Sequence, residues 1–95
     1  MNSNNDESLL DAYMKTVVVL DTKDHYLYLG KLAKLDLHFV CLQDADVHDL
    51  NISRTPKDLY LIDAKKYGIN ASRKEVLVIR EQIMSISKLE DILEF

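Results

Sequence analysis

Acidic residues and a histidine cluster near the middle of the sequence, in a pattern that could hold a metal ion. Asp44, Asp46 and His48 alternate, and Asp49 follows directly. Carboxylate and imidazole groups are normal ligands of zinc and of hard cations. Alternate side chains on a strand share one face at a spacing of about 6.8 Å, which is wide for a single ion unless the chain turns. We therefore expect a solvated strand end that leads into a loop, without a bound metal.

Cys41 is the only cysteine of the chain, and His38 lies three residues before it. Side chains three residues apart on a strand point to opposite faces, so these two cannot form a nucleophile–base pair. We expect Cys41 to be a small core residue. Gly30 and Gly68 are the only glycines, which leaves no glycine-rich phosphate loop, and no HExxH pair is present. The sequence predicts neither an enzyme nor a cofactor.

Arg80 and His38 each allow two interpretations. Arg80 could stack on a nucleobase or contact a phosphate, or it could form an ion pair with Glu81, Asp36 or a neighbouring subunit. His38 could stack on a base, or it could be a partly buried histidine at the start of a strand. The residues alone leave these alternatives open.

The composition indicates one globular domain without a strong attraction for polyanions. The 95 residues are 47% apolar and 29% charged, which suits a single core. Twelve Lys and Arg against 16 Asp and Glu give a net charge of -4, whereas proteins that grip long stretches of phosphate backbone are normally basic. The longest apolar run, 17–20, is too short to cross a membrane, and residues 1–7 do not resemble a signal peptide. We expect a cytoplasmic protein without a membrane partner.

The apolar segments predict a small antiparallel β-barrel of five strands. The second segment is long and has Gly30 in its middle, where the missing side chain lets a sheet bend strongly. Only Glu81 and Gln82 separate the last two segments, so these form either a tight hairpin or a strand that bends across the barrel. The segments are 16–20, 25–35, 38–42, 75–80 and 83–87.

Two helices are predicted outside these strands. The first spans about 6–14, where Asn5 can cap a turn and an apolar stripe follows. The second spans 56–67, between strands three and four, where Thr55 and Asp58 suggest a capping box and Gly68 a C-terminal cap. The whole chain is then one domain, 1–95, with a barrel over 16–46 and 74–88 and a helical insertion over about 55–68.

The inserted helix has two expected roles. As a lid on the open end of the barrel it would bury Leu59 and Ile62. Its outer face, with Tyr60, Tyr67 and the lysines 65–66, would suit a protein partner or a weak nucleic-acid contact.

Two parts of the sequence resemble the motifs of the Sm/LSm family. In the second motif a strand ends in Arg80, and a short final strand, 83–86, follows. The closest resemblance is to bacterial Sm-like proteins without assigned function. It implies a strongly bent five-stranded antiparallel Sm-like barrel, mainly β, with an N-terminal helix and, here, a helical insertion between strands 3 and 4. The positions that match the first motif are Tyr28, Gly30, Leu32, Asp36, Leu42, Asp44 and Ala45.

The resemblance also implies an assembly and a ligand. The expected assembly is a homo-oligomeric ring, a hexamer or heptamer, in which strand 4 of one subunit pairs with strand 5 of the next. The expected ligand is a short single-stranded RNA, bound in a ribonucleoprotein by Asp36, His38 and Arg80. The chain departs from the family because no Asn follows Asp36 and because Glu81 occupies the usual glycine position. A protein-interaction scaffold that has lost RNA recognition is the alternative function.

Overall fold

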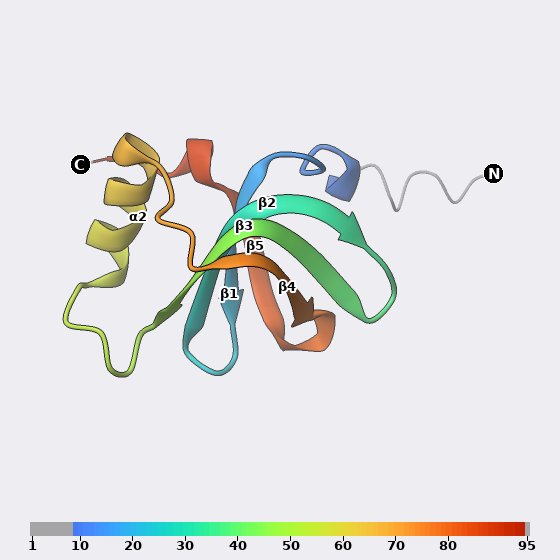
Figure 1. The fold of residues 1–95 in the computed structure, drawn as a ribbon, viewed down its shortest axis with the longest axis horizontal. Helices are drawn as coiled ribbons and strands as arrows, with labels where there is room; N and C mark the ends of the chain where they lie inside the picture. The colour runs from blue at the N-terminus through green and yellow to red at the C-terminus, as the bar shows by residue number, and fades with distance from the viewer. Residues whose placement is uncertain (1–8, 95) are drawn as a thin grey trace.

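The computed structural model describes residues 9–94 and shows one antiparallel sheet of five strands (Figure 1). Helix α2 (Lys57–Tyr67) lies between β3 and β4 in the chain, and two short 3₁₀ turns, η1 (Arg80–Gln82) and η2 (Leu89–Asp91), flank β5. Within residues 9–94 no helix has the length and apolar character needed to span a bilayer. The strands are β1 (Val17–Thr22), β2 (Tyr26–Leu35), β3 (Phe39–Asp49), β4 (Arg73–Ile79) and β5 (Ile83–Lys88).

The predicted N-terminal helix, about 6–14, lies partly outside the described residues. Residues 9–11 are helical, and residues 12–15 form turns that lead into β1. Lys15 has a φ of 64° at the end of these turns, and its N–H donates to the Leu32 carbonyl oxygen at 2.7 Å. The chain therefore enters the sheet beside β2.

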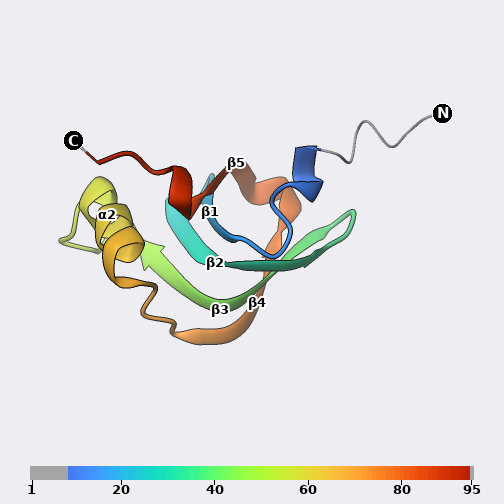
Figure 2. The same ribbon diagram turned by 90° about the horizontal axis from the view of Figure 1, so that it is seen from above.

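The strand order is β4-β3-β2-β1-β5, with antiparallel pairing throughout. The predicted mainly β, five-stranded antiparallel fold is confirmed. The sheet curves, as Figure 2 shows, but it is not closed, because β4 and β5 lie at its two opposite edges. The alternative of a β4–β5 hairpin is wrong. η1 leads from β4 to β5, and the Lys23 N–H, which donates to the Gln82 carbonyl oxygen at 2.9 Å, holds the start of β5 beside β1.

Gly30 is the point at which β2 passes closest to β3. A Cβ atom placed there would lie 3.0 Å from the Cβ atoms of both Ala45 and Leu42. The pairing register shifts at this point, between Leu29 and Lys31, and Asp44 on the opposing strand has a φ of 49°. This is a β-bulge, in which an extra residue on one strand increases the local twist. The absence of a side chain at Gly30 thus permits the close approach of β2 and β3 at this bulge.

Both faces of the sheet centre are buried. Side chains of β1 alternate between two clusters, with Val18 and Leu20 in the first and Val19 in the second. The first cluster lies on one face of the sheet and includes Val40 and Leu42, the two residues that flank Cys41 in the chain. Cys41 itself is buried, as predicted, and burial raises the pKa of its thiol. The second cluster joins β1 and β2 to α2 and η2, through Val19, Leu27, Leu29, Leu61, Ala64 and Leu89.

Helix α2 covers the sheet with a different face from the one predicted. Leu61 and Ala64 are buried against the strands, whereas Leu59 is 50% exposed and Ile62 is half-buried. Leu59 and Ile62 were expected to be the buried pair, and this expectation is wrong. The sequence has apolar residues on more than one side of this helix, so periodicity alone does not select the side that packs.

The predicted capping box of α2 does not form. Pro56 is the N-terminal cap residue, and no side chain caps the helix. Thr55 instead lies one residue outside the helix, where its N–H donates to Ser53 Oγ at 3.1 Å and its carbonyl oxygen lies 3.2 Å from His48 Nε2. Thr55 therefore contacts Ser53 and the His48 side chain of β3, and it does not cap the helix.

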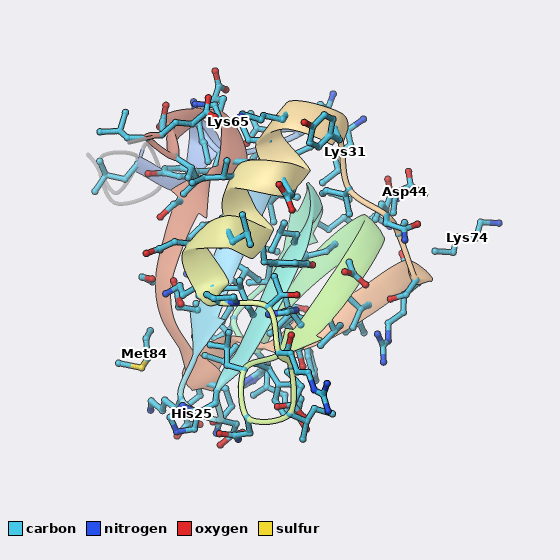
Figure 3. The ribbon with its side chains drawn as sticks, turned by 90° about the vertical axis from the view of Figure 1, so that its left-hand side faces the viewer. His25, Lys31, Asp44, Lys65, Lys74 and Met84 are labelled. Carbon is cyan, nitrogen blue, oxygen red and sulfur yellow. The ribbon has the colours of Figure 1, made fainter. Side chains whose placement is uncertain are left out.

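Polar contacts attach both ends of α2 to the rest of the molecule. Lys57 Nζ donates to Asp21 Oδ1 at 2.5 Å at the start of the helix. At its end, Lys65 donates to the Ile92 carbonyl oxygen at 2.5 Å, and Lys66 pairs with Glu94 at 3.1 Å. Figure 3 shows the helix lying across the strands, with Lys65 near its C-terminal end.

Candidate functional site

The turn that precedes β3 and the 3₁₀ turn that follows β4 lie side by side. Phe39 on β3 pairs with Ile79 on β4. The next residue, Arg80, donates its N–H to the His38 carbonyl oxygen at 2.8 Å. The antiparallel pairing of β3 and β4 therefore brings Asp36, His38 and Arg80 together from positions more than 40 residues apart in the chain. Figure 1 shows that this end of the molecule lies opposite α2.

The carboxylate of Asp36 holds the turn. Its Oδ1 atom accepts hydrogen bonds from the N–H groups of His38 and Phe39, each at 2.8 Å. The hydrogen bonds from Phe39 and then His38 favour the charged form and lower the pKa of this carboxyl group. The main chain closes the turn as well, because the Asp36 N–H donates to the Phe39 carbonyl oxygen at 3.0 Å. Asp36 therefore shapes the site from within its own loop.

Arg80 is anchored to the same turn. Its Nη1 atom donates to the main-chain oxygen of Asp36 at 2.6 Å. Among residues 9–94 the ion pairs are Lys57–Asp21 and Lys66–Glu94, so an ion pair of Arg80 with Asp36 or Glu81 within the chain is not formed. The guanidinium is instead oriented by a neutral main-chain oxygen.

His38 is exposed, so the interpretation of a partly buried histidine is wrong. The backbone of the turn explains this exposure. The His38 N–H donates to the Asp36 carboxylate, and the His38 carbonyl oxygen accepts from the Arg80 N–H. The side chain extends into solvent. The imidazole is thus available to a ligand.

A shallow groove runs between the two turns. Its apolar lining includes Leu37, which is 80% exposed, beside Phe39 and Ile79. Apolar walls beside a histidine and an arginine suit a flat ring, because bases stack on aromatic rings and on guanidinium planes. The lining residues are Leu37, His38, Phe39, Ile79, Arg80 and Glu81.

The acidic cluster on β3 has a structural role that the sequence did not reveal. Asp46 accepts hydrogen bonds from Tyr60 Oη at 2.6 Å and from Ser72 Oγ at 2.8 Å. His48 is buried and stacks on the Tyr60 ring, with 4.0 Å between centroids and 11° between planes. Burial and the bond to Asp46 raise the pKa of the Tyr60 hydroxyl.

The prediction of a solvated strand end is therefore wrong for two of the cluster's members. Asp46 and His48 attach α2 to β3, whereas Asp44, at the bulge, points away from the helix (Figure 3). Within the described part of the chain, no three His, Cys, Asp or Glu side chains are grouped closely enough to hold a metal ion. The signal that sequence analysis missed is Tyr60, an aromatic residue with a polar tip on the first turn of the helix.

An apolar groove opens beside the first core cluster and the free edge of β5. Arg80 lies at the border between this groove and the shallow one described above, since it lines both. The apolar lining of the groove beside β5 includes Met84, which is 70% exposed. The other lining residues are Leu10, Leu20, Leu32, Leu35, Val40, Ile83, Ser85 and Ile86.

Comparison with known proteins places the fold. No protein-family model matches the chain, and no curated protein sequence matches it. A Pyrococcus abyssii Sm protein, solved in complex with a uridine heptamer, superposes with a TM-score of 0.59 at 16% identity, over 85% of this chain and 93% of that one. The SmAP (LSm) protein from Methanococcus vannielii superposes with a TM-score of 0.57 at 19% identity, over 92% of this chain and 98% of that one. At these identities the likeness shows that the chain has an Sm fold.

Proposed function

We propose that this protein is the subunit of an Sm-like ring that binds short single-stranded RNA through a site repeated around the ring. The observation that carries the proposal is the groove between the two turns, where an exposed imidazole and an anchored guanidinium flank apolar walls. Support comes from the fold, which is shared with an Sm protein solved in complex with a uridine heptamer. The proposed role is binding, without catalysis, in the cytoplasm.

In this role His38 and Arg80 contact the RNA, and Asp36 positions them. One base would stack in the groove, against His38 or the Arg80 guanidinium, and the remaining guanidinium N–H groups would meet the phosphate. The net charge of -4 limits long-range attraction, so the contact is local.

Assembly into a ring would repeat the weak RNA site of one subunit and so raise the affinity of the whole oligomer for RNA. The two edge strands, β4 and β5, carry exposed apolar side chains, among them Leu77, Ile79 and Met84. Unpaired apolar edges promote aggregation unless a partner covers them. Pairing β4 of one subunit with β5 of the next would satisfy these edges, complete a bent barrel at each junction and close a ring, of six or seven subunits by the family resemblance. The repeated sites then act together on one strand.

Fluorescence titration of labelled uridine-rich and adenine-rich oligonucleotides against the intact oligomer tests this function. We expect saturable binding that weakens as salt rises. Arg80→Ala should weaken binding by about tenfold or more, as expected for loss of a stacking contact, while the oligomer persists. Arg54→Ala is the matched control, because Arg54 is an exposed arginine in the loop before α2. No saturable binding at low salt would contradict the proposal.

A protein-interaction scaffold is the second candidate, and the insertion favours it. Tyr67 is 82% exposed at the end of α2, close in sequence to the lysines 65–66, and Ile52 and Leu59 are also exposed. Exposed aromatic and apolar side chains with a polar surround are typical of protein contacts. Tyr60, by contrast, is excluded from this face because it points to β3. A scaffold would keep its ring but show no binding that depends on Arg80.

A further inference from the structure

The groove beside Arg80 contains a carboxylate that the proposed function does not use. Glu81 lines the groove and is exposed. Among residues 9–94, no ion pair and no side-chain hydrogen bond engages the Glu81 carboxylate. Asp36, the other nearby acid, has its Oδ1 atom committed to the two N–H groups of its own turn. Glu81 is therefore the carboxylate in the groove that a ligand can reach.

Besides Glu81, the polar side chains of the groove are the His38 imidazole and the Arg80 guanidinium. Leu37, Phe39 and Ile79 offer apolar contact, and one guanidinium nitrogen of Arg80 is bound to the Asp36 main-chain oxygen. An ionised carboxylate accepts hydrogen bonds and cannot donate them. A base held in this groove would thus meet a pair of acceptor oxygens at its edge.

The four RNA bases differ in what they present to such a pair. The Watson–Crick edge of guanine carries two adjacent donors, N1–H and the N2 amino group, at a spacing that suits the two oxygens of one carboxylate. Uracil has one N–H between two carbonyl oxygens, and these oxygens repel a carboxylate. In cytosine and adenine a single amino donor lies beside a ring nitrogen that accepts. A carboxylate therefore binds guanine with two charge-assisted hydrogen bonds and discriminates against uracil.

We infer that Glu81 is a specificity-determining residue that selects guanine in the groove, with the base stacked beside Arg80. This inference rests on the proposed function, because it assigns the base class of the same RNA site. Arg80 also explains how a carboxylate is compatible with an anionic ligand. The adjacent guanidinium offsets the charge of Glu81 at the groove, so the phosphate meets a site that is close to neutral.

Three labelled hexamers test the inference by fluorescence anisotropy with the full-length oligomer. One is all uridine, one has a single central guanosine, and one has a single central inosine, which keeps N1–H but lacks the N2 amino group. A single guanosine avoids the four-stranded structures that guanine runs form. We expect the guanosine hexamer to bind about tenfold more tightly than the uridine hexamer, as for one bidentate base contact, with the inosine hexamer in between.

Glu81→Gln is the decisive variant, because glutamine replaces the acceptor pair by one acceptor and one donor. It should remove the guanosine preference while binding of all three hexamers continues. Glu90→Gln, at an exposed glutamate on η2, should keep the preference. Uridine bound as tightly as guanosine, or a preference that survives Glu81→Gln, would overturn the guanine assignment alone. No saturable binding of any hexamer would overturn the RNA function with it.

Discussion

At the scale of single residues, the candidate site depends on a turn that is held by one carboxylate. Asp36, His38 and Arg80 could be chosen from the sequence because they match positions of a known motif. What could not be predicted is which contacts each of these three residues makes. The contacts show that Asp36 bonds the main chain of its own loop. They also show that Arg80 is anchored to a main-chain oxygen, a contact that the β3–β4 pairing brings about.

Replacement of Asp36 should therefore affect stability in a pH-dependent way. The hydrogen bonds from Phe39 and His38 lower its pKa below the ordinary value of 3.8, so the folded state binds this proton less readily than the unfolded state. The stabilisation is then complete above the unfolded pKa and is lost as the pH falls through the folded one. Asp36→Asn keeps a neutral acceptor for the same N–H groups. We expect it to be less stable than the wild type at pH 7 and equally stable once the pH lies below the folded pKa.

Urea unfolding at a series of pH values measures this difference. Asp58→Asn, at an exposed aspartate on the first turn of α2, provides a comparison with no such turn to hold. A constant gap between wild type and Asp36→Asn down to the lowest pH would contradict the role of the charged carboxylate.

At the scale of secondary-structure elements, the order and type of the strands and of the inserted helix agree with the sequence-based prediction. The way in which the inserted helix packs on the sheet does not. Alternation and β-branched runs predict five strands near their observed positions, although β3 extends to Asp49, beyond the predicted 38–42. Gly30 marks the bulge at which β2 lies close against β3. The rotation of α2 could not be predicted, because its apolar residues cover more than one side. The Tyr60–Asp46 bond joins residues 14 apart on different elements, and only the packed structure creates it.

Tyr60 should accordingly stabilise the attachment of α2. Tyr60→Phe keeps the ring stacked on His48 and removes the hydroxyl that donates to Asp46 at 2.6 Å. Loss of a hydrogen bond to a charged acceptor, on a half-buried group, should lower the free energy of unfolding by about 1–2 kcal/mol. Tyr67→Phe is the matched control, since Tyr67 is exposed at the end of the same helix and should have no measurable effect. Equal effects of the two substitutions in chemical denaturation would show that the bond contributes nothing.

At the scale of the whole molecule, the open sheet is the feature that most shapes function. One chain leaves β4 and β5 as the two edges of a curved sheet, and an apolar groove lies beside β5. The sequence indicates apolar edge strands, and burial separates the residues of these strands that hold the core from those that stay exposed. Val78 is 4% exposed and belongs to the core, so a charge there would unfold the subunit.

Met84 is the better position for testing assembly. It projects from the outer edge of β5 in Figure 3 and lines the apolar groove, so a neighbouring β4 would cover it in a ring. Met84→Asp would place a carboxylate in that covered position, where an unpaired charge is costly, yet it would leave the isolated subunit intact. We expect multi-angle light scattering at micromolar concentration to show an oligomer for the wild type and a monomer for Met84→Asp, with unchanged circular dichroism. Leu93→Asp, at an exposed leucine beyond η2, should remain oligomeric. A monomeric wild type would refute the ring, and an oligomeric Met84→Asp would exclude the β5 edge as its contact surface.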